Sequence, residues 1–252
     1  MRNKMQRKRA TAQRLDFATK MVGLRRSKDG DFRLGCILAA IAGAANAGGF
    51  FALGHYTSHM TGYMSMLADS IATMDLKIVA LCILAISSFV AGAAFSTSLI
   101  NWSRLRLRRQ QYALPLAVQG VLMLCFAGGG IFSSTAGLIF SLACLSFIMG
   151  MQNATITKIS EARIRTTHIT GLVTDVGIEL GRAIFSWLVP SSEVRADLEK
   201  LRIIGGLPLA FLIGGVIGAV GFSKFGFMFS VPLAMILLIL SVPVLIRNRN
   251  AR

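Results

Sequence analysis

The sequence contains the polar motif His-x-Thr-Gly twice, and the side chains of this motif are the first candidates for chemistry. The two copies consist of His59, Thr61 and Gly62 and of His168, Thr170 and Gly171. A Thr-Gly turn that opens a helix presents unpaired N–H groups and the positive end of the helix dipole, which suit an anionic ligand group. We therefore predict that both motifs bind substrate, with the histidines donating hydrogen bonds or transferring protons. The structural alternative is that Thr61 and Thr170 only cap helices and the glycines only permit close packing.

An amide residue lies at a matched place in the apolar stretch before each motif. Asn46 lies in Gly-Ala-Ala-Asn-Ala, and Asn153 lies in Gly-Met-Gln-Asn-Ala beside Gln152. A buried amide without a partner costs roughly 1–3 kcal/mol, so each of these side chains needs one. Because both copies have Asn at the same point, we predict that Asn46, Gln152 and Asn153 form a shared substrate-binding centre near the midplane. The alternative is an interhelical hydrogen bond that only holds the helices together.

Three carboxylates follow the motifs within semi-polar segments. Asp69 comes after the first motif, and Asp175 and Glu179 come after the second. Carboxylates at membrane depth are costly and indicate by default a path for ions or protons. We predict ion or proton coupling at these three residues. The alternatives are that Arg182, which shares a helix face with Glu179, only neutralises it, and that Asp69 lies at the outer interface with Asp75.

No metal, cofactor or catalytic site is predicted. His55 and His59 have a spacing that suits two metal ligands on a helix, but His168 is the only other histidine in the sequence. The four cysteines lie in apolar stretches without a Cys-x-x-Cys spacing, which is typical of buried thiols. Because no nucleophile or nucleotide-binding motif occurs, we do not expect an enzyme.

The composition places these residues in a membrane. Of the 252 residues, 54% are hydrophobic and 15% are charged, and the mean hydropathy is +0.63, whereas soluble domains average about 25% charged residues. A membrane-spanning helix needs about 20 apolar residues. Six stretches qualify, namely 33–54, 76–101, 113–131, 136–158, 204–222 and 226–246. The semi-polar segments 60–73 and 169–189 follow the two motifs.

The basic residues orient these spans. All of the 27 Lys and Arg residues except Lys77 and Lys224 lie in four clusters, at residues 1–33, 104–109, 158–202 and 247–252. Cytoplasmic loops carry the excess of Lys and Arg, so both termini are expected in the cytoplasm. A net charge of +16 would suit nucleic acid, but this distribution argues for the lipid bilayer as the partner. A homo-oligomer is left open.

Six spans with both termini inside predict an inverted repeat. The sequence then divides into a basic tail at 1–32, a first repeat of three spans at 33–131, a second at 136–246, and a basic tail at 247–252. In weaker agreement, residues 92–96 in the second span echo residues 218–223 in the fifth. We therefore predict an all-α integral membrane protein with six transmembrane helices in an inverted three-plus-three repeat. The two His-x-Thr-Gly segments would be broken or re-entrant, one facing outward and the other inward.

These residues resemble a known family. The stretches Ala-Gly-Ala-Ala-Asn-Ala-Gly-Gly-Phe (42–50), Thr-Ser-His-Met-Thr-Gly (57–62), Met-Gly-Met-Gln-Asn-Ala (149–154) and Arg-Thr-Thr-His-Ile-Thr-Gly-Leu-Val-Thr-Asp (165–175) are similar to the YoaK family. The resemblance covers about 35–246 and implies a multi-pass protein of the bacterial inner membrane. It supplies no substrate and no catalytic residue. Many members have Asp where this chain has Asn46 and Asn where it has Tyr63, so any coupling through that Asp does not carry over.

An inverted repeat with irregular backbone in matching places is the physical signature of a secondary transporter. We expect a small secondary transporter or channel-like permease for an unidentified small molecule or ion, with proton coupling as an option. The alternative is a non-transporting membrane scaffold or regulator that binds lipid or a partner through its basic cytoplasmic face.

Overall fold

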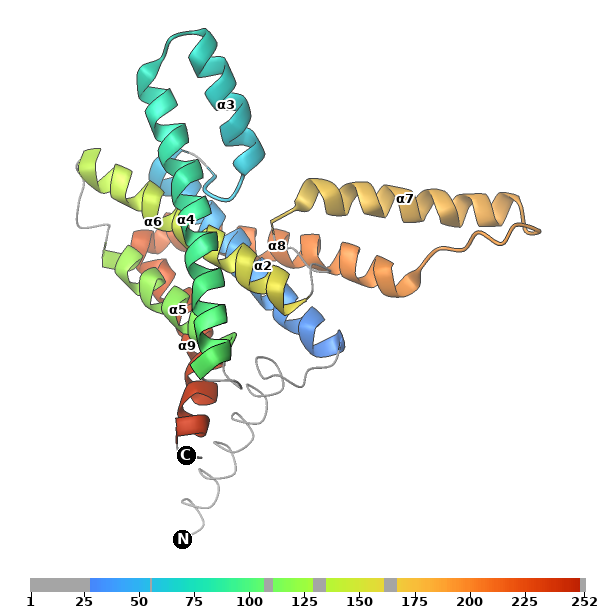
Figure 1. The fold of residues 1–252 in the computed structure, drawn as a ribbon. Helices are drawn as coiled ribbons and strands as arrows, with labels where there is room; N and C mark the ends of the chain where they lie inside the picture. The colour runs from blue at the N-terminus through green and yellow to red at the C-terminus, as the bar shows by residue number, and fades with distance from the viewer. Residues whose placement is uncertain (1–27, 55, 107–110, 129–134, 161–166, 250–252) are drawn as a thin grey trace.

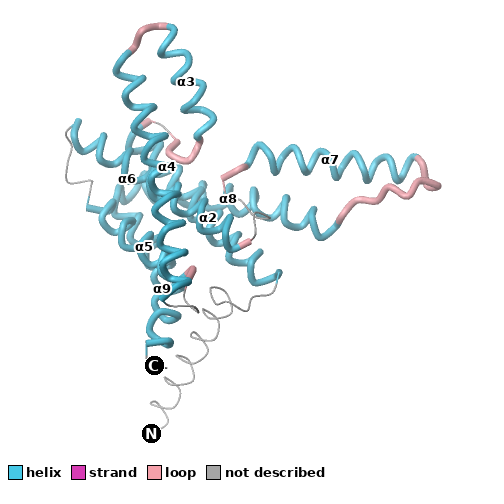
Figure 2. The backbone as a smooth tube through the Cα atoms, in the orientation of Figure 1, coloured by secondary structure: helices cyan, strands magenta, loops and turns pink. Residues whose placement is uncertain are grey.

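The computed structural model of the chain describes residues 28–54, 56–106, 111–128, 135–160 and 167–249, and among these residues there are helices and no strands (Figures 1 and 2). Several features named above lie outside the described residues. They are the basic tail as far as residue 27, His55, residues 107–110 at the end of the second basic cluster, residues 129–134, residues 161–166 of the third basic cluster, and residues 250–252.

Six helices coincide with the six apolar stretches of the sequence. They are α2 (Lys28–Leu53), α4 (Leu76–Arg106), α5 (Ala113–Gly128), α6 (Thr135–Ile159), α8 (Leu198–Phe225) and α9 (Ser230–Arg249). Each His-x-Thr-Gly motif opens a further helix, α3 (Met60–Ala72) or α7 (Ile169–Leu188), and the 3-10 turn η2 (Gly226–Phe229) joins α8 to α9.

The helices are long and apolar enough for an integral membrane protein. Within the described residues, the stretches Asp29–Phe51, Leu76–Arg106, Ala136–Ile159 and Leu198–Ile246 meet this criterion, and the last contains α8 and most of α9. Ala113–Gly128 is a shorter apolar helix. Since a helix rises 1.5 Å per residue, about 20 residues cross the hydrocarbon core. The all-α membrane class predicted from the sequence is confirmed.

Helix α8 begins earlier than the apolar stretch that predicted it, at Leu198 instead of residue 204. The cause is a helix cap, because the carboxylate of Asp197 accepts a hydrogen bond from the backbone N–H of Lys200 at 3.0 Å. An Asp at this position satisfies one of the N–H groups that the first helical turn leaves unpaired. The first turn of α8 is therefore polar, and it precedes the apolar part of the helix.

Glycines bring the backbones of separate helices into contact. A methyl group added to Gly43 on α2 would overlap the backbone of Phe211 on α8. In the same way, a methyl group on Gly150 of α6 would overlap the backbone of Phe89 on α4. Small residues allow this close approach, which supplies packing energy where lipid removes the hydrophobic drive between helices. Helix α2 thus pairs with α8, and α6 pairs with α4.

The helices of each pair run parallel. Along α2 and α8, Gly214 packs against Ala40 and, one turn further along both helices, Gly218 packs against Ala44. Helix α9 completes the bundle by packing against α5, where Gly120 lies against Leu238.

The pairing of α4 with α6 has the same direction. Gly92 packs against the backbone of Phe147, and further along both helices the hydroxyls of Ser96 and Thr155 form a buried hydrogen bond of 2.7 Å. Because both hydroxyls are fully buried, this bond prevents the cost of leaving either of them unpaired.

Two hairpins project from the bundle in different directions (Figure 1). In one, α3 lies beside the first part of α4, and in the other α7 lies beside the first part of α8. The main hydrophobic core lies among α2, α5, α6, α8 and α9, whereas a smaller cluster around Tyr63, Cys82, Ala85 and Leu142 joins α3 to α4 and α6.

Candidate functional site

The first motif is attached to helix α2 by the side chain of Asn46. Its Oδ1 atom accepts two hydrogen bonds from Ser58, one from the backbone N–H at 3.1 Å and one from the hydroxyl at 3.0 Å. Ser58 is buried and lies directly before His59. Asn46 therefore fixes the turn that opens α3.

The second motif is attached to helix α6 in a similar way. The hydroxyl of Thr167, directly before His168, donates a hydrogen bond of 2.9 Å to Oδ1 of Asn153. The Nδ2 atom of Asn153 donates to the carbonyl of Met149 on its own helix at 3.2 Å. The matched asparagines thus have matched partners, and both partners are hydroxyl residues that precede the motif histidine.

The motif threonines are not the helix caps. Helix α3 begins at Met60 and α7 at Ile169, so the N-cap positions belong to His59 and His168, neither of which makes a side-chain cap bond. Thr61 and Thr170 are second in their helices and exposed. The capping alternative for these threonines is wrong, because the helices begin one residue too early for it.

The two motif glycines have different surroundings. A side chain at Gly62 would collide with the imidazole of His59, so this glycine makes room for the ring. Around Gly171 no atom lies within 4 Å of the place that a methyl group would take. The close-packing alternative therefore holds for Gly62 and fails for Gly171.

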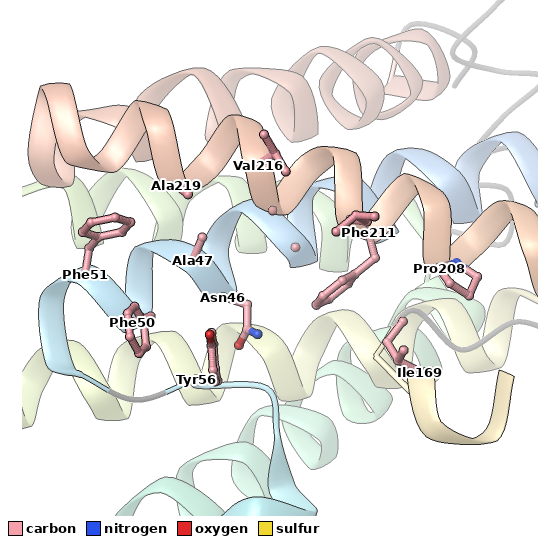
Figure 3. A pocket seen from close by; sticks show the side chains of 13 residues that line it. Asn46, Ala47, Phe50, Phe51, Tyr56, Ile169, Pro208, Phe211, Val216 and Ala219 are labelled. Atoms are coloured by element: carbon pink, nitrogen blue, oxygen red, sulfur yellow. The ribbon is translucent and has the colours of Figure 1, made fainter. Parts of the chain in front are cut away.

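A pocket of about 650 Å³ lies on the α2–α8 pair next to the first motif (Figure 3). Gly43, Asn46, Ala47, Phe50 and Phe51 of α2 contribute to it, together with Tyr56 from the loop, Ile169 from the start of α7, and Pro208, Phe211, Leu212, Gly215, Val216 and Ala219 of α8. Figure 3 shows the amide of Asn46 between Tyr56 and Phe211. Asn46 and Tyr56 supply the polar side chains of a lining that is otherwise apolar.

A second, smaller pocket of about 180 Å³ lies at the first motif itself. It is lined by Gly54, Tyr56, His59, Gly62, Tyr63 and Met66. Tyr56 lines both pockets, so the two are neighbours. The structure thus brings Asn46, His59 and Gly62 near one another, while Thr61 lines neither pocket.

The buried glutamines join helices. Gln152 of α6 donates from Nε2 to the carbonyl of Leu38 on α2, and Gln119 of α5 donates to the carbonyl of Ile148 on α6 at 3.1 Å. Both side chains are at most 1% exposed. For Gln152 the observed contact is the interhelical hydrogen bond that the sequence left as the alternative.

The carboxylate of Glu179 lies at the centre of an ionic cluster between α7 and α8. Its Oε1 lies 3.0 Å from Arg182 and 3.3 Å from Lys200, and its Oε2 accepts from the backbone N–H of Asp197 at 3.0 Å. The Glu179 side chain is fully buried. The N–H of Asp197 is the main cause that lowers the pKa of Glu179, and the hydrogen bond from Lys200 and the charges of Arg182 and Lys200 lower it further. Glu179 is therefore ionised at neutral pH.

The other two carboxylates are more accessible. Asp175 lies 3.4 Å from Lys200, and its side chain is 41% exposed. Asp69 is exposed near the end of α3, before the turn at Met74, which has a positive φ of 58°. The structure brings Asp175 and Glu179 together through Lys200 and leaves Asp69 in the other hairpin.

Ser58, Thr167, Tyr56 and Phe211 were missed from the sequence. A signal existed for the first two, since each is a hydroxyl residue directly before the histidine of a motif. No comparable signal marks Phe211, which reaches the pocket only because α8 packs against α2. In the described part of the chain, no group of three or more His, Cys, Asp or Glu side chains is arranged to hold a metal ion.

Comparisons with known proteins agree with the membrane class. Residues 34–243 match the family described as "Protein of unknown function (DUF1275)". The chain is similar to the UPF0700 transmembrane protein YoaK of Bacillus subtilis (strain 168), with 22% identity over 202 residues, which cover 79% of this chain and 88% of that protein. No solved structure matches the chain.

Proposed function

The chain belongs to the DUF1275 family, and from that starting point we propose that it is a small secondary transporter or channel-like permease of the bacterial inner membrane. In this proposal α2, α4 and α5 form one half and α6, α8 and α9 form an inverted second half. All six helices cross the membrane, both termini are cytoplasmic, and the two hairpins lie on opposite sides.

The reciprocal contacts between the halves support the inverted repeat. Gly43 and Gly150 hold matched places before the two asparagines, and each packs against the backbone of a phenylalanine in the other half, Phe211 or Phe89. Each of the two related pairs, α2 with α8 and α6 with α4, thus joins a helix of the first half to a helix of the second. A two-fold axis between α2 and α6 accounts for all of these contacts.

The observation that carries the transport proposal is the position of the larger pocket. Its residues come from α2 in the first half and from α7 and α8 in the second. Inverted-repeat transporters bind their substrates where the two repeats meet, and movement of one half against the other changes the side from which the site is open. Asn46 joins the pocket to the first motif, so a change at the pocket can reach that motif.

The carboxylates have separate roles in this proposal. Glu179 is buried and holds α7 to the start of α8 through Lys200 and the backbone N–H of Asp197, while Arg182 pairs with it from α7 itself. Asp175 has a single described ion-pair partner, Lys200, and a half-exposed side chain. We therefore place ion or proton coupling, if the transport is coupled, at Asp175 rather than at Glu179.

Solute uptake into proteoliposomes tests the proposal directly. Purified protein would be assayed with a panel of radiolabelled uncharged and charged metabolites, against empty liposomes and an Asn46→Leu variant. We expect saturable uptake of one solute class that the variant loses.

Labelling of single cysteines at the two motifs gives a second readout, which can be used even if the Asn46→Leu variant does not fold. Thr61→Cys and Thr170→Cys place a thiol at matched exposed positions. For a transporter, the transported solute should lower labelling at one motif and raise it at the other. If no solute is taken up and labelling never changes, the protein is a scaffold and the proposal is wrong.

A further inference from the structure

We propose that the 650 Å³ pocket beside Asn46 binds an uncharged, mainly apolar solute that presents one hydrogen-bond acceptor to the Nδ2 atom of Asn46. This inference rests on the proposed permease function and names the class of its substrate. It departs from the sequence-based expectation of an anionic ligand group, which placed the ligand at the Thr-Gly turns.

The lining of the pocket disfavours a charged ligand. None of the described residues around it is acidic or basic, and the lining consists of aromatic, aliphatic and small residues apart from Asn46 and Tyr56. Transfer of an ionised group into such surroundings without a counter-charge is strongly unfavourable. The ionic cluster of Glu179, Arg182 and Lys200 contributes no residue to the pocket.

The orientation of the Asn46 amide is fixed by its partner. The backbone N–H of Ser58 can only donate, so the atom that faces it must be Oδ1. The Nδ2 group then points the other way, toward the space between Phe211 and Ile169 in Figure 3. Among the described residues, none accepts a hydrogen bond from Nδ2. The pocket therefore contains a donor, and a ligand needs an acceptor to pair with it.

The remaining walls favour a compact apolar body. The ring of Tyr56 stacks on that of Phe50 with centroids 5.0 Å apart and an interplanar angle of 19°, which gives one wall a flat aromatic surface. Ala47 adds only a methyl group to the lining, and Gly43 and Gly215 add no side chain. A volume of about 650 Å³ lies inside the roughly 300–1,000 Å³ typical of pockets for drug-sized ligands.

Binding of three probes with one ring system tests the inference. Acetylnaphthalene is uncharged and has a carbonyl acceptor, ethylnaphthalene lacks the acceptor, and naphthoate carries a negative charge. Each would be measured by equilibrium dialysis against the full chain in lipid nanodiscs at a pH of about 8, with empty nanodiscs subtracted to remove partition into lipid. We expect acetylnaphthalene to bind saturably, roughly two- to tenfold more tightly than ethylnaphthalene, which is the contribution of one ordinary hydrogen bond. Naphthoate should not bind at the site.

Asn46→Asp is the decisive variant. It keeps the oxygen that Ser58 needs, so the motif stays attached to α2, and it replaces the Nδ2 donor by an acceptor. The preference for acetylnaphthalene over ethylnaphthalene should disappear. Asn101→Asp makes the same change at an exposed amide that does not line the pocket, and it should keep the preference.

Ala47→Leu keeps the amide, narrows the pocket floor and should weaken both uncharged probes. It keeps the inference testable if Asn46→Asp does not fold.

Each contrary outcome identifies what is wrong. Three outcomes overturn the ligand class. They are tight binding of naphthoate, no saturable binding of acetylnaphthalene, and an unchanged preference in Asn46→Asp. A co-purified phospholipid that none of the probes displaces also overturns the ligand class and assigns the pocket to lipid. Binding of acetylnaphthalene without uptake of any solute overturns the permease and leaves the ligand class standing. Uptake confined to carboxylates overturns the ligand class and leaves the permease standing.

Discussion

Ser58 donates both its backbone N–H and its hydroxyl to the same oxygen of Asn46, at 3.1 and 3.0 Å. The two residues are 12 positions apart in the chain, with Asn46 on α2 and Ser58 in the loop that leads from α2 to α3. The side chain of Asn46 on helix α2 therefore holds in place the residue that directly precedes the first motif.

Replacing Asn46 should separate attachment from chemistry. Asn46→Leu removes the acceptor for both donors and leaves the buried Ser58 N–H unpaired, so it should lower the free energy of unfolding by about 1–3 kcal/mol. Asn46→Asp keeps the acceptor for both Ser58 donors, so it avoids this loss, although its carboxylate carries a cost of its own beside apolar residues. Thermal unfolding in detergent measures both, with Ser98→Ala on the exposed face of α4 as the control that should change nothing. A loss in Asn46→Leu no larger than that in Ser98→Ala would show that the Ser58 bonds do not stabilise the fold.

Gly43→Ala and Gly150→Ala should each destabilise the bundle. The added methyl overlaps the backbone of Phe211 or Phe89, and overpacking of this kind typically costs about 1–3 kcal/mol. Gly205→Ala on α8 is the matched control, because nothing lies within 4 Å of the new methyl. It should be neutral or slightly stabilising, since Ala is the better helix former. A neutral Gly150→Ala would contradict the observed contact of α6 with α4.

The tips of the two hairpins should lie on opposite sides of the membrane. In a variant without Cys36, Cys82, Cys125 and Cys144, single cysteines at Ala72 at the end of α3 and at Ser191 after α7 place thiols at exposed positions. A membrane-impermeant maleimide should label Ala72→Cys in intact cells and Ser191→Cys only after permeabilisation. Labelling of both in intact cells would refute the inverted arrangement.

Glu179→Gln should destabilise the protein in a pH-dependent way. The surroundings lower the pKa of Glu179 from its ordinary value near 4.5, so its ionised form stabilises the folded state. That contribution is fully present above about pH 4.5 and is lost as the pH falls through the lower pKa of the folded state.

The difference in unfolding free energy between the wild-type chain and Glu179→Gln should therefore be largest at neutral pH and shrink in acid. Unfolding curves of both proteins from about pH 7 to about pH 3 measure it. Glu193→Gln, at an exposed position between α7 and α8, should show no such dependence. A difference that does not change with pH would mean that Glu179 acts through packing alone.

Thr61→Val and Thr170→Val should leave stability nearly unchanged, within about 0.5 kcal/mol. Both side chains are exposed and neither is the cap of its helix. A loss of about 1 kcal/mol, as typical caps give, would restore the capping interpretation. Loss of solute uptake at unchanged stability would instead assign these hydroxyls to the substrate path.

The helices of the bundle were predictable because hydropathy and length suffice for them. The pairing of the helices was not, because contacts such as Gly43 with Phe211 join residues far apart in the chain. The echo of residues 92–96 in residues 218–223 shows this limit. In the structure it is Gly214, not Gly218, that packs against Ala40 as Gly92 packs against Phe147.

The candidate site was predictable in part. Asn46 and His59 do lie near one another, since the repeated motifs identified them. The pocket was not predictable, because its apolar lining has the same composition as the rest of the helices. The hairpin residue Thr61 was predicted to bind substrate together with Asn46, yet it is exposed and lines neither pocket.

The pairing of α2 with α8 and of α4 with α6, each across the two halves of the chain, has a consequence for synthesis. When the ribosome has completed α5, none of α2, α4 and α5 has yet met the helix against which it packs most closely, since α8, α6 and α9 are still to be made. The glycine-lined faces of the first three helices must therefore stay in contact with lipid or with the insertion machinery for the time that the remaining half takes to appear. A chain that ends after α5 contains half of the residues of the bundle and none of its three principal helix pairs.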